Sequence, residues 1–442
     1  MTRLLIWFLA PALALAGVPS LIAIRGAHVV PVSGPEMAQA TVVVRDGVIE
    51  AVGANVAIPQ GAWVIDGKGL TVYPGFVDAL DDAGIPAARP AAPGGPRPGT
   101  GAPAAPSAPP ARGPEDRPST ESWLRAADLV QPDGPHVHEL RSAGFTTAVS
   151  FPMQGIFAGQ GAVIDLGGER GGDMVVETPA GEYITTGTHG FGSYPGSLMG
   201  VIAYIRQLYL DAGYYKTVRA AYDQHQAGVP RPAYDRAIEG VLGPPRILLP
   251  AGRLVEIDRM VRFGKELGQK TVLYGMAEGY RAGDLLKTAN VPVLVNVNWP
   301  EAPRDGDPNA YVTLRTLEVR QNAPSTAAVL NKAGVRFAFY SGGLTRRTAL
   351  VKAMRRALDA GLSRADAVRA MTLAPAEIYG VADRLGTIEK GKIANLTVTD
   401  GDWFEEKTKV KFVLVDGKKY EPEPEMPPPA GDGGGRAPGV AK

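Results

Sequence analysis

The stretch that best indicates the fold is GLTVYPGFVD, residues 69–78 of the 442-residue chain. It lies where the pattern of the sequence changes. Before it, residues 21–73 predict short strands, with β-branched runs such as 41–45 and a tight turn at Asp46-Gly47. After it, strand-like apolar runs alternate with helical segments. We therefore expect residues 69–78 to join a small β region to a larger α/β region.

The larger region has the pattern of a parallel sheet. It predicts strands at 146–150, 247–249, 271–274, 291–295 and 335–340, and helices at about 254–267 and 345–360. Strand–helix repeats of roughly 20 to 40 residues favour a (β/α)8 TIM-like barrel in a chain of this length. The alternative is a doubly wound open sheet, but no glycine-rich dinucleotide loop follows the first strand.

The carboxyl end of the chain returns to a strand pattern. Residues 396–398 and 411–415 are β-rich runs, and Asp416-Gly417 repeats the turn signal. We expect the two ends to pair, so that residues 21–73 with 384–420 form a small composite β-sandwich domain. Residues 74–383 then form the barrel.

The first 16 residues have the features of a signal peptide. Arg3 precedes an apolar run over 4–15, and Ala14-Leu15-Ala16 offers small residues for cleavage. This predicts a periplasmic or secreted protein. The chain has no cysteine, so its core must stabilise it without disulfides. No second run approaches the roughly 20 residues of a membrane span, so none is expected after removal of the signal.

Composition excludes some partners and marks two segments of low complexity. Lys plus Arg number 46 and Asp plus Glu 45, which gives no reason to expect nucleic acid. Residues 86–118 are rich in Pro, Ala and Gly, and 421–442 have the same character. Such runs bury too little apolar surface to offset their ordering entropy, so we expect both to be disordered.

Four motifs in order indicate a known family. Residues 69–78, AGFTT at 143–147, AMTLAPA at 370–376 and LGTIEKGKIANL at 385–396 resemble segments of the amidohydrolase superfamily, and most closely its imidazolonepropionase-like, exported bacterial subgroup. The resemblance implies a (β/α)8 barrel with a composite β-sandwich. It also implies hydrolysis of non-peptide carbon–nitrogen bonds by a water that zinc or another divalent metal activates.

The positions that the resemblance assigns to metal ligands hold other residues. The two histidines expected after Asp78 are replaced, and so are the ligands at strands 5, 6 and 8; the residues found there are Leu80, Asp82, Pro250, the run 273–275 and Gly342. Only Asp82 could bind a metal, and one carboxylate is not a zinc site. We therefore assign no metal ligand or catalytic residue and expect no cofactor.

The chain's five histidines offer little replacement. His136-Val137-His138 begins a helix, where residues i and i+2 do not share a face, so we expect surface histidines. His28 lies in the small domain, and His225 lies in a polar helical segment. His189 lies in a glycine-rich loop of the kind that lines barrel mouths.

Six polar residues are candidates for lining a pocket at the carboxyl ends of the strands, where barrel sites are built. They are Asp82, His189, Glu278, Asn296, Asn298 and Ser341. For several of them, an ordinary packed turn or a satisfied loop residue is the simpler interpretation.

Three functions are compatible with the sequence. In the first, the barrel is degenerate and metal-free and acts as a subunit or a ligand-binding barrel, with a small-molecule ligand. It would then form a homo-oligomer, or a mixed oligomer with a ligand-complete amidohydrolase. In the second, the chain is an active metal-dependent hydrolase of cyclic amides or N-acyl compounds with relocated ligands, such as His189 with Asp82. The third, an interaction role for the Pro-rich segments, has the least support because they carry little aromatic or charged patterning.

Overall fold

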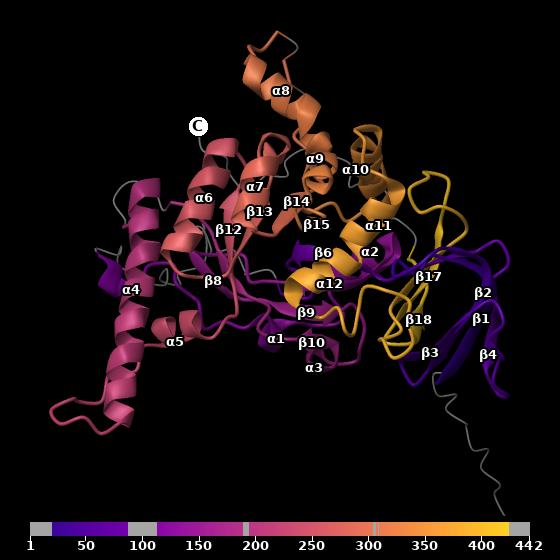
Figure 1. Ribbon diagram of the computed structural model, residues 1–442, viewed down its shortest axis with the longest axis horizontal. Helices are drawn as coiled ribbons and strands as arrows, with labels where there is room; N and C mark the ends of the chain where they lie inside the picture. Colours follow the sequence, from indigo (N-terminus) through magenta and orange to yellow (C-terminus); the bar gives the residue numbers. More distant parts are fainter. Residues whose placement is uncertain (1–19, 87–112, 189–193, 304–305, 308, 424–442) are drawn as a thin grey trace, which may run out of the picture.

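The computed structural model describes residues 20–86, 113–188, 194–303, 306–307 and 309–423 (Figure 1). The expected signal peptide, residues 1–16, lies outside this part, as do most of the segments expected to be disordered. The described residues form a mixed α/β structure. No helix in these ranges is both long and apolar enough to cross a membrane.

An eight-stranded sheet contains strands from both ends of the chain and lies at one side of the molecule (Figure 1). Its order is β18-β17-β16-β5-β1-β2-β3, and β4 pairs with β1. The strands are β1 (Leu21–Val29), β2 (Met37–Arg45), β3 (Val48–Gly53), β4 (Trp63–Asp66), β5 (Thr71–Pro74), β16 (Leu396–Thr399), β17 (Val410–Val415) and β18 (Lys418–Tyr420). The ladder between β5 and β16 joins the two ends of the chain. The division into a sandwich and a barrel domain stays a prediction.

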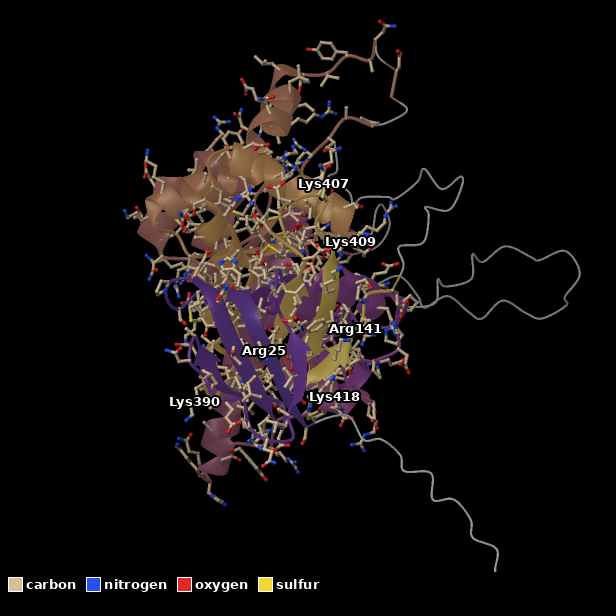
Figure 2. The ribbon with its side chains drawn as sticks, turned by 90° about the vertical axis from the view of Figure 1, so that its right-hand side faces the viewer. Arg25, Arg141, Lys390, Lys407, Lys409 and Lys418 are labelled. Atoms are coloured by element: carbon tan, nitrogen blue, oxygen red, sulfur yellow. The ribbon has the colours of Figure 1, made fainter. Side chains whose placement is uncertain are left out.

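Two tight turns of this sheet are those that the sequence predicts. Asp46 and Gly47 have φ angles of 49° and 81°, and Asp416 and Gly417 have 49° and 72°. Two successive positive φ angles are typical of the turn that matches the twist of a hairpin, and Asp-Gly is a preferred pair there. Figure 2 shows that Arg25, Lys390, Lys407, Lys409 and Lys418 are spread over this side of the molecule.

Two further sheets form the middle of the protein. One has the order β15-β14-β13-β12-β11-β8 and the other β10-β9-β7-β6. Their strands are β6 (Phe76–Asp81), β7 (Phe145–Ser150), β8 (Phe157–Gln160), β9 (Ala162–Asp165), β10 (Val175–Glu177), β11 (Glu182–Ile184), β12 (Ile247–Ala251), β13 (Thr271–Gly275), β14 (Val293–Asn296) and β15 (Phe337–Tyr340). β11 to β15 are parallel and follow one another in sequence order, as successive strands of a barrel do.

The segment 157–165 departs from an all-parallel barrel. β8 pairs antiparallel with β11, and β9 pairs antiparallel with β7, with only Gly161 between β8 and β9. A Cβ atom on Gly161 would lie 2.2 Å from Cε1 of Phe151, so this position requires glycine. β15 contacts β6, but the described strands include no ladder between them. Closure into a (β/α)8 barrel therefore stays a prediction.

Twelve α-helices are present in the described residues. They are α1 (Ala126–Leu129), α2 (Pro135–Ala143), α3 (Gly171–Met174), α4 (Leu198–Asp223), α5 (Arg236–Leu242), α6 (Leu254–Glu266), α7 (Gly283–Ala289), α8 (Leu314–Asn322), α9 (Thr326–Ala333), α10 (Arg347–Asp359), α11 (Arg364–Met371) and α12 (Leu373–Tyr379); single 3-10 turns span Pro114–Asp116, Gly279–Arg281 and Ala323–Ser325. α6 and α10 confirm two predicted helices. α6 buries Ile257, Met260 and Phe263 at helical spacing.

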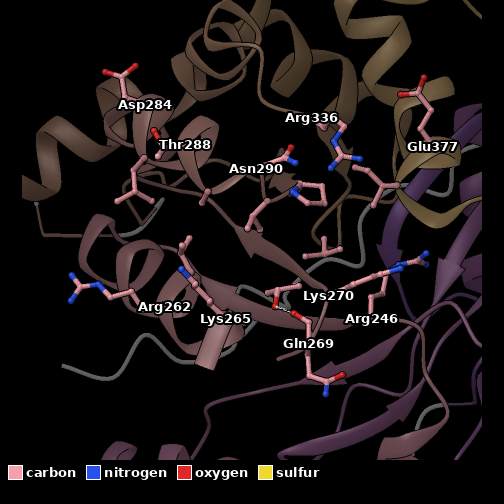
Figure 3. Close-up of a pocket in the computed structure, with 18 residues that line it drawn as sticks. Arg246, Arg262, Lys265, Gln269, Lys270, Asp284, Thr288, Asn290, Arg336 and Glu377 are labelled. Atoms are coloured by element: carbon pink, nitrogen blue, oxygen red, sulfur yellow. Dashed lines mark hydrogen bonds between the residues drawn. The ribbon is translucent and has the colours of Figure 1, made fainter. Parts of the chain in front are cut away.

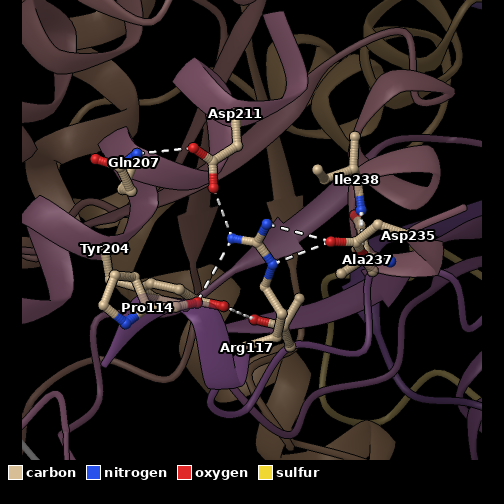
Figure 4. A network of polar contacts seen from close by, with 10 residues as sticks. Pro114, Arg117, Tyr204, Gln207, Asp211, Asp235, Ala237 and Ile238 are labelled. Atoms are coloured by element: carbon tan, nitrogen blue, oxygen red, sulfur yellow. Dashed lines mark hydrogen bonds and ion pairs between the residues drawn. The ribbon is translucent and has the colours of Figure 1, made fainter. Parts of the chain in front are cut away.

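Residues 113–118 are ordered, although the sequence favoured disorder across 86–118. Arg117 anchors them between α4 and α5 (Figure 4). Its Nη1 atom is 2.8 Å from Oδ2 of Asp211, and its Nη2 atom is 3.2 Å from Oδ2 of Asp235. Asp235 also caps α5 through the amides of Ala237 and Ile238. The two ion pairs of Arg117 therefore hold residues 113–118 in place, although the surrounding Pro, Ala and Gly residues offer few contacts of their own.

Replacing Arg117 by alanine is expected to lower the free energy of unfolding by about 1–2 kcal/mol, because three hydrogen bonds to two carboxylates are lost at a partly exposed position. Urea unfolding measures the change. Arg231→Ala is the matched control, because this exposed arginine in the same region has no ion pair among the described residues. Equal losses in the two variants would contradict the assigned role.

A buried carboxyl group lies between β11 and α4. Glu182 is 0% exposed, and neither carboxyl oxygen has a hydrogen-bond partner among the described residues. The hydroxyl of Tyr209, from α4, is also buried without a partner. Burial raises the pKa of Glu182 well above its ordinary value. The group is therefore protonated in the folded protein at pH values where the unfolded chain has ionised.

This difference predicts a pH-dependent loss of stability. Stability from Glu182 is greatest below its unfolded pKa, near 4.5, and falls by up to about 1.4 kcal/mol per pH unit as the pH rises toward the folded pKa. Glu182→Gln removes this slope and is expected to raise stability at pH 8 by about 1–3 kcal/mol. Urea unfolding at pH 5 and pH 8 checks it, with the exposed Glu121→Gln as control. An unchanged pH slope in Glu182→Gln would refute this account.

Candidate metal and active site

The candidate site begins where β6 ends. All six residues of β6 are buried, and Asp82 follows directly with its side chain 61% exposed. The amide of Phe151, just after β7, donates to the carbonyl of Asp81 at 2.8 Å. The hydroxyl of Ser150 donates to the carbonyl of Ala83, also at 2.8 Å. These bonds fix the chain on both sides of Asp82, so the carboxyl groups of Asp81 and Asp82 are held together at the end of β6, beside the end of β7.

His136 reaches this point from the first turn of α2. Pro135 starts the helix at the first helical position, a place that suits proline. Nε2 of His136 is 2.5 Å from Oδ1 of Asp81 and 3.8 Å from Oδ1 of Asp82. Burial alone would lower the pKa of His136, but the hydrogen bond to Asp81 and the charges of both aspartates raise it to about 9. In the absence of a metal, His136 is therefore the cation that offsets this acidic pair.

A third carboxylate, Asp78, connects this group to the end of β15. Both carboxyl oxygens of Asp78 accept from the amide of Ser341, at 3.0 and 3.3 Å. The hydroxyl of Ser341 is 3.2 Å from Oδ2 of Asp81. Complete burial raises the pKa of Asp78 well above its ordinary value, and the charge of Asp81 adds to the shift. The ends of β6 and β15 therefore meet in one polar cluster.

The donor set can hold a divalent cation. One ligand atom from each of Asp81, Asp82 and His136 lies within 4.8 Å of the other two. Two carboxylates and one imidazole are ligands that suit zinc or manganese, and an exposed Asp82 leaves room for water or substrate. The hydroxyl of Ser341 donates to Oδ2 of Asp81, and the other carboxyl oxygen of Asp81, Oδ1, faces His136. The expectation that no ligand set is present is therefore not confirmed.

The sequence-based candidates have different environments. Asp82 and Ser341 both adjoin Asp81. The side chain of Asn298 donates to the carbonyl of Gly342 at 3.1 Å, and its amide donates to Asn296 at 2.8 Å, so these two stand beside the Ser341 turn.

Glu278 is 2% exposed and is bound by Arg315 and the Leu254 amide. Burial opposes its ionisation, but these two partners lower its pKa, which marks a structural ion pair. His189 lies outside the described residues. The roles of all six in binding a ligand stay predictions.

The interpretation of His136 as a surface histidine is wrong. The argument that His136 and His138 do not share a face holds, because His138 binds Glu423 at 2.6 Å instead. The conclusion failed because α2 follows β6, so its first turn lies at the carboxyl end of that strand. The strand–helix order in the sequence is the signal that could have placed His136 beside Asp81. The contact of Glu423 also shows that the described start of the 421–442 tail is ordered.

Tyrosines surround the other strand ends. Tyr274 stands on β13, where the resemblance places a histidine ligand, and its ring stacks on Tyr183 with centroids 5.0 Å apart. The ring of Phe151 lies 5.8 Å from Tyr183. Burial raises the pKa of Tyr183, and the charge of Asp82 adds to the shift. Aromatic rings therefore pack against Tyr183, whose pKa responds to the charge of Asp82.

Comparisons with known proteins agree with the resemblance to amidohydrolases, while the imidazolonepropionase-like subgroup stays a prediction. Residues 267–420 match the model of the amidohydrolase family. This part of the chain is therefore similar to the amidohydrolase family. An amidohydrolase from Thermotoga maritima MSB8 is similar to this chain with a TM-score of 0.71 and 24% identity, over 91% of this chain and 100% of that one. No curated protein sequence matched.

Two further solved structures have a fold similar to that of this chain. One is an amidohydrolase with a TM-score of 0.53 and 17% identity, over 92% of this chain and 100% of that one. The other is a prolidase complexed with N-methylphosphonate-L-proline, with a TM-score of 0.52 and 16% identity, over 91% of this chain and 100% of that one. At these identities the likeness shows the fold alone.

Proposed function

We propose that the protein is a hydrolase of the amidohydrolase superfamily that acts on non-peptide carbon–nitrogen bonds, with a divalent metal held by Asp81, Asp82 and His136. The observation that carries the proposal is the close approach of these three donors at the carboxyl end of β6. That is the strand whose end supplies two metal ligands in the family that the sequence resembles. We further propose that the protein is exported to the periplasm or secreted.

The residues of the chain divide the work at this site. A bound divalent metal would supply Lewis acidity and lower the pKa of a bound water. Asp81, Asp82 and His136 would hold the metal. Ser341 orients Asp81 through its hydroxyl, and Asp78 holds the Ser341 turn in place. The exposed Asp82 is the group nearest to solvent, so it is the one that a substrate would meet first.

A second candidate function has its own support. The ligand positions implied by the resemblance hold Leu80, Pro250, Tyr274 and Gly342, and Tyr274 is packed against Tyr183. In this alternative the protein binds no metal and acts as a ligand-binding protein or as a subunit beside a ligand-complete amidohydrolase. Aromatic and amide side chains such as Tyr183 and Asn298 would then contact a neutral organic ligand.

Metal content and hydrolysis together decide between the two. The protein would be produced with zinc and manganese supplied, purified without chelators, and analysed for bound metal. It would then be assayed against cyclic amides and N-acyl compounds. About one metal per chain together with hydrolysis supports the proposed enzyme. Absence of both favours the second function, and bound metal without hydrolysis of any compound rejects the hydrolase.

A further inference from the structure

A row of cations lies at the amino ends of the parallel strands, at the opposite end of those strands from Ser341. The Ile247 amide of β12 donates to the carbonyl of Lys270 at 2.8 Å, and the Val293 amide of β14 donates to the carbonyl of Arg336 at 3.0 Å. Arg246 and Lys270 thus precede β12 and β13 at the same level, and Arg336, which precedes β15, lies two residues further along in the strand register. Adjacent strands lie about 4.8 Å apart, so Arg246 and Lys270 are neighbours, while β14 separates Lys270 from Arg336 by about 10 Å across the sheet. Long lysine and arginine side chains can span such a gap to reach one ligand.

These cations border a hollow of about 1070 Å³ between α6, α7 and the strand starts (Figure 3). Arg262 and Lys265 of α6 add two more cations, and among the described residues only Asp284 and Glu377 are acidic members of the lining. Its volume is at the upper end of the range for small-molecule sites, roughly 300–1,000 Å³. The hollow is therefore large enough for an organic ligand rather than a single ion.

The charges in the hollow are not balanced by their neighbours. Arg262 pairs with Asp258, and Glu377 pairs with Arg369. The lining residues Arg262 and Glu377 therefore contribute little net charge to the hollow. Lys265 lies in the last turn of α6, where a positive charge offsets the helix dipole. Lys270 and Arg336 precede strands, are exposed, and have no ion-pair partner in the described part of the chain. The helix dipole therefore does not explain them.

Arg246 contributes differently. Its Nη1 atom donates to the carbonyls of Ala180 and Tyr379, at 2.7 and 3.4 Å. No carboxylate among the described residues forms an ion pair with it, so its positive charge is still uncompensated. It borders the hollow on the side of α12, next to Lys270 in the strand register.

Apolar side chains supply the remaining lining. They come from α6, α7, β14 and α12 and include Val261, Leu285, Val291, Pro292 and Ile378. An apolar surface bordered by cations suits a molecule with an apolar body and a negative group. We propose that this hollow binds an organic anion, whose acidic group is bound by Lys270 and Arg336 and whose body lies on these apolar side chains. The site is separate from the proposed hydrolase and does not depend on it.

Binding of 1-anilinonaphthalene-8-sulfonate to the folded full chain tests the proposal, because this probe has a sulfonate on an apolar body. Saturable binding is expected from a fluorescence titration. The double variant Lys270→Gln/Arg336→Gln should weaken it at least tenfold. Lys407→Gln/Lys409→Gln is the matched control: it removes the same charge on the side of the eight-stranded sheet shown in Figure 2, and should leave binding unchanged.

Three results would overturn the site. They are non-saturable binding, equal weakening in the two double variants, and equal affinity for a neutral naphthalene alcohol that competes with the probe. Circular dichroism melting of both variants accompanies the titrations, since partial unfolding also binds this dye. If Lys270→Gln/Arg336→Gln is less stable than the control, the charge-conserving double variant Lys270→Arg/Arg336→Lys decides: it should retain binding, and weakening equal to that of the glutamine variant would overturn the site.

Discussion

Replacing Asp81 by asparagine is expected to lower the affinity of the protein for Zn²⁺ or Mn²⁺ by about 100-fold or more, which corresponds to about 2.7 kcal/mol. Asp81 is the central ligand of the proposed set, because it lies 2.5 Å from His136 and precedes Asp82 in the chain. An amide keeps the size of the side chain but removes the negative charge that a cation requires. Equilibrium dialysis with elemental analysis measures the affinity.

A histidine pair gives the matched control for the same site. His136→Gln should also weaken metal binding, because the imidazole is one of three donors. His138→Gln should not, since His138 lies two residues further along α2 and binds Glu423 instead of Asp81. Equal affinities in the two variants, or retention of metal in Asp81→Asn, would show that any metal is bound elsewhere.

The variant Asp78→Asn tests whether Asp78 binds the metal itself or only holds Ser341 in position. Asp78 accepts from the amides of Ser341 and Leu80, and it has no hydrogen bond to Asp81, Asp82 or His136. Its replacement should therefore leave the metal stoichiometry unchanged and act through the position of Ser341. Loss of the metal in this variant would instead place Asp78 among the ligands.

The sequence predicts the elements of regular structure well where local pattern and tertiary contact agree. The runs at 271–274 and 335–340 became β13 and β15, and the predicted helix at 254–267 became α6. Gly75 illustrates why the segment 69–78 is informative. A Cβ atom there would lie 1.9 Å from Oγ1 of Thr146, so the passage from β5 to β6 permits only glycine.

The region between β7 and β12 was not predicted, for a physical reason. β8, β9 and β11 are short strands whose partners lie far along the chain or run antiparallel. Their glycines, such as Gly159 and Gly161, lower strand propensity but are required by close contacts of the fold. α4 carries exposed Leu210 and Tyr214 as well as buried Tyr204 and Leu208, so it lacks a single apolar face that would identify it.

The candidate site, too, depends on contacts between distant segments that the sequence pattern does not reveal. The resemblance directed attention to Leu80 and Asp82, two residues apart at the end of β6, but the donor nearest to His136 is Asp81 between them. A ligand set assembled from a strand end and the start of the next helix depends on tertiary geometry. Residue spacing within one motif cannot supply it.

Trp403→Ala is expected to cause the largest loss of stability, about 3–5 kcal/mol. Trp403 is 0% exposed and lies between β16 and β17. Its indole Nε1 donates to the carbonyl of Ala143, at the end of α2, at 3.0 Å. Its ring meets that of Phe76, the first residue of β6, edge to face with centroids 5.1 Å apart. One side chain thus joins the eight-stranded sheet to the elements that carry Asp81 and His136.

Urea unfolding of three variants tests this linkage. Trp403→Phe keeps an aromatic ring but leaves the Ala143 carbonyl without its donor, so about 1–3 kcal/mol should be lost. Trp63→Ala is the control, because this tryptophan is 41% exposed and its removal should change stability by no more than about 0.5 kcal/mol. Since Phe76 and Ala143 belong to the two elements of the proposed metal site, Trp403→Phe should also weaken metal binding if the site is present. Similar losses for Trp63→Ala and Trp403→Ala would mean that Trp403 does not join these elements.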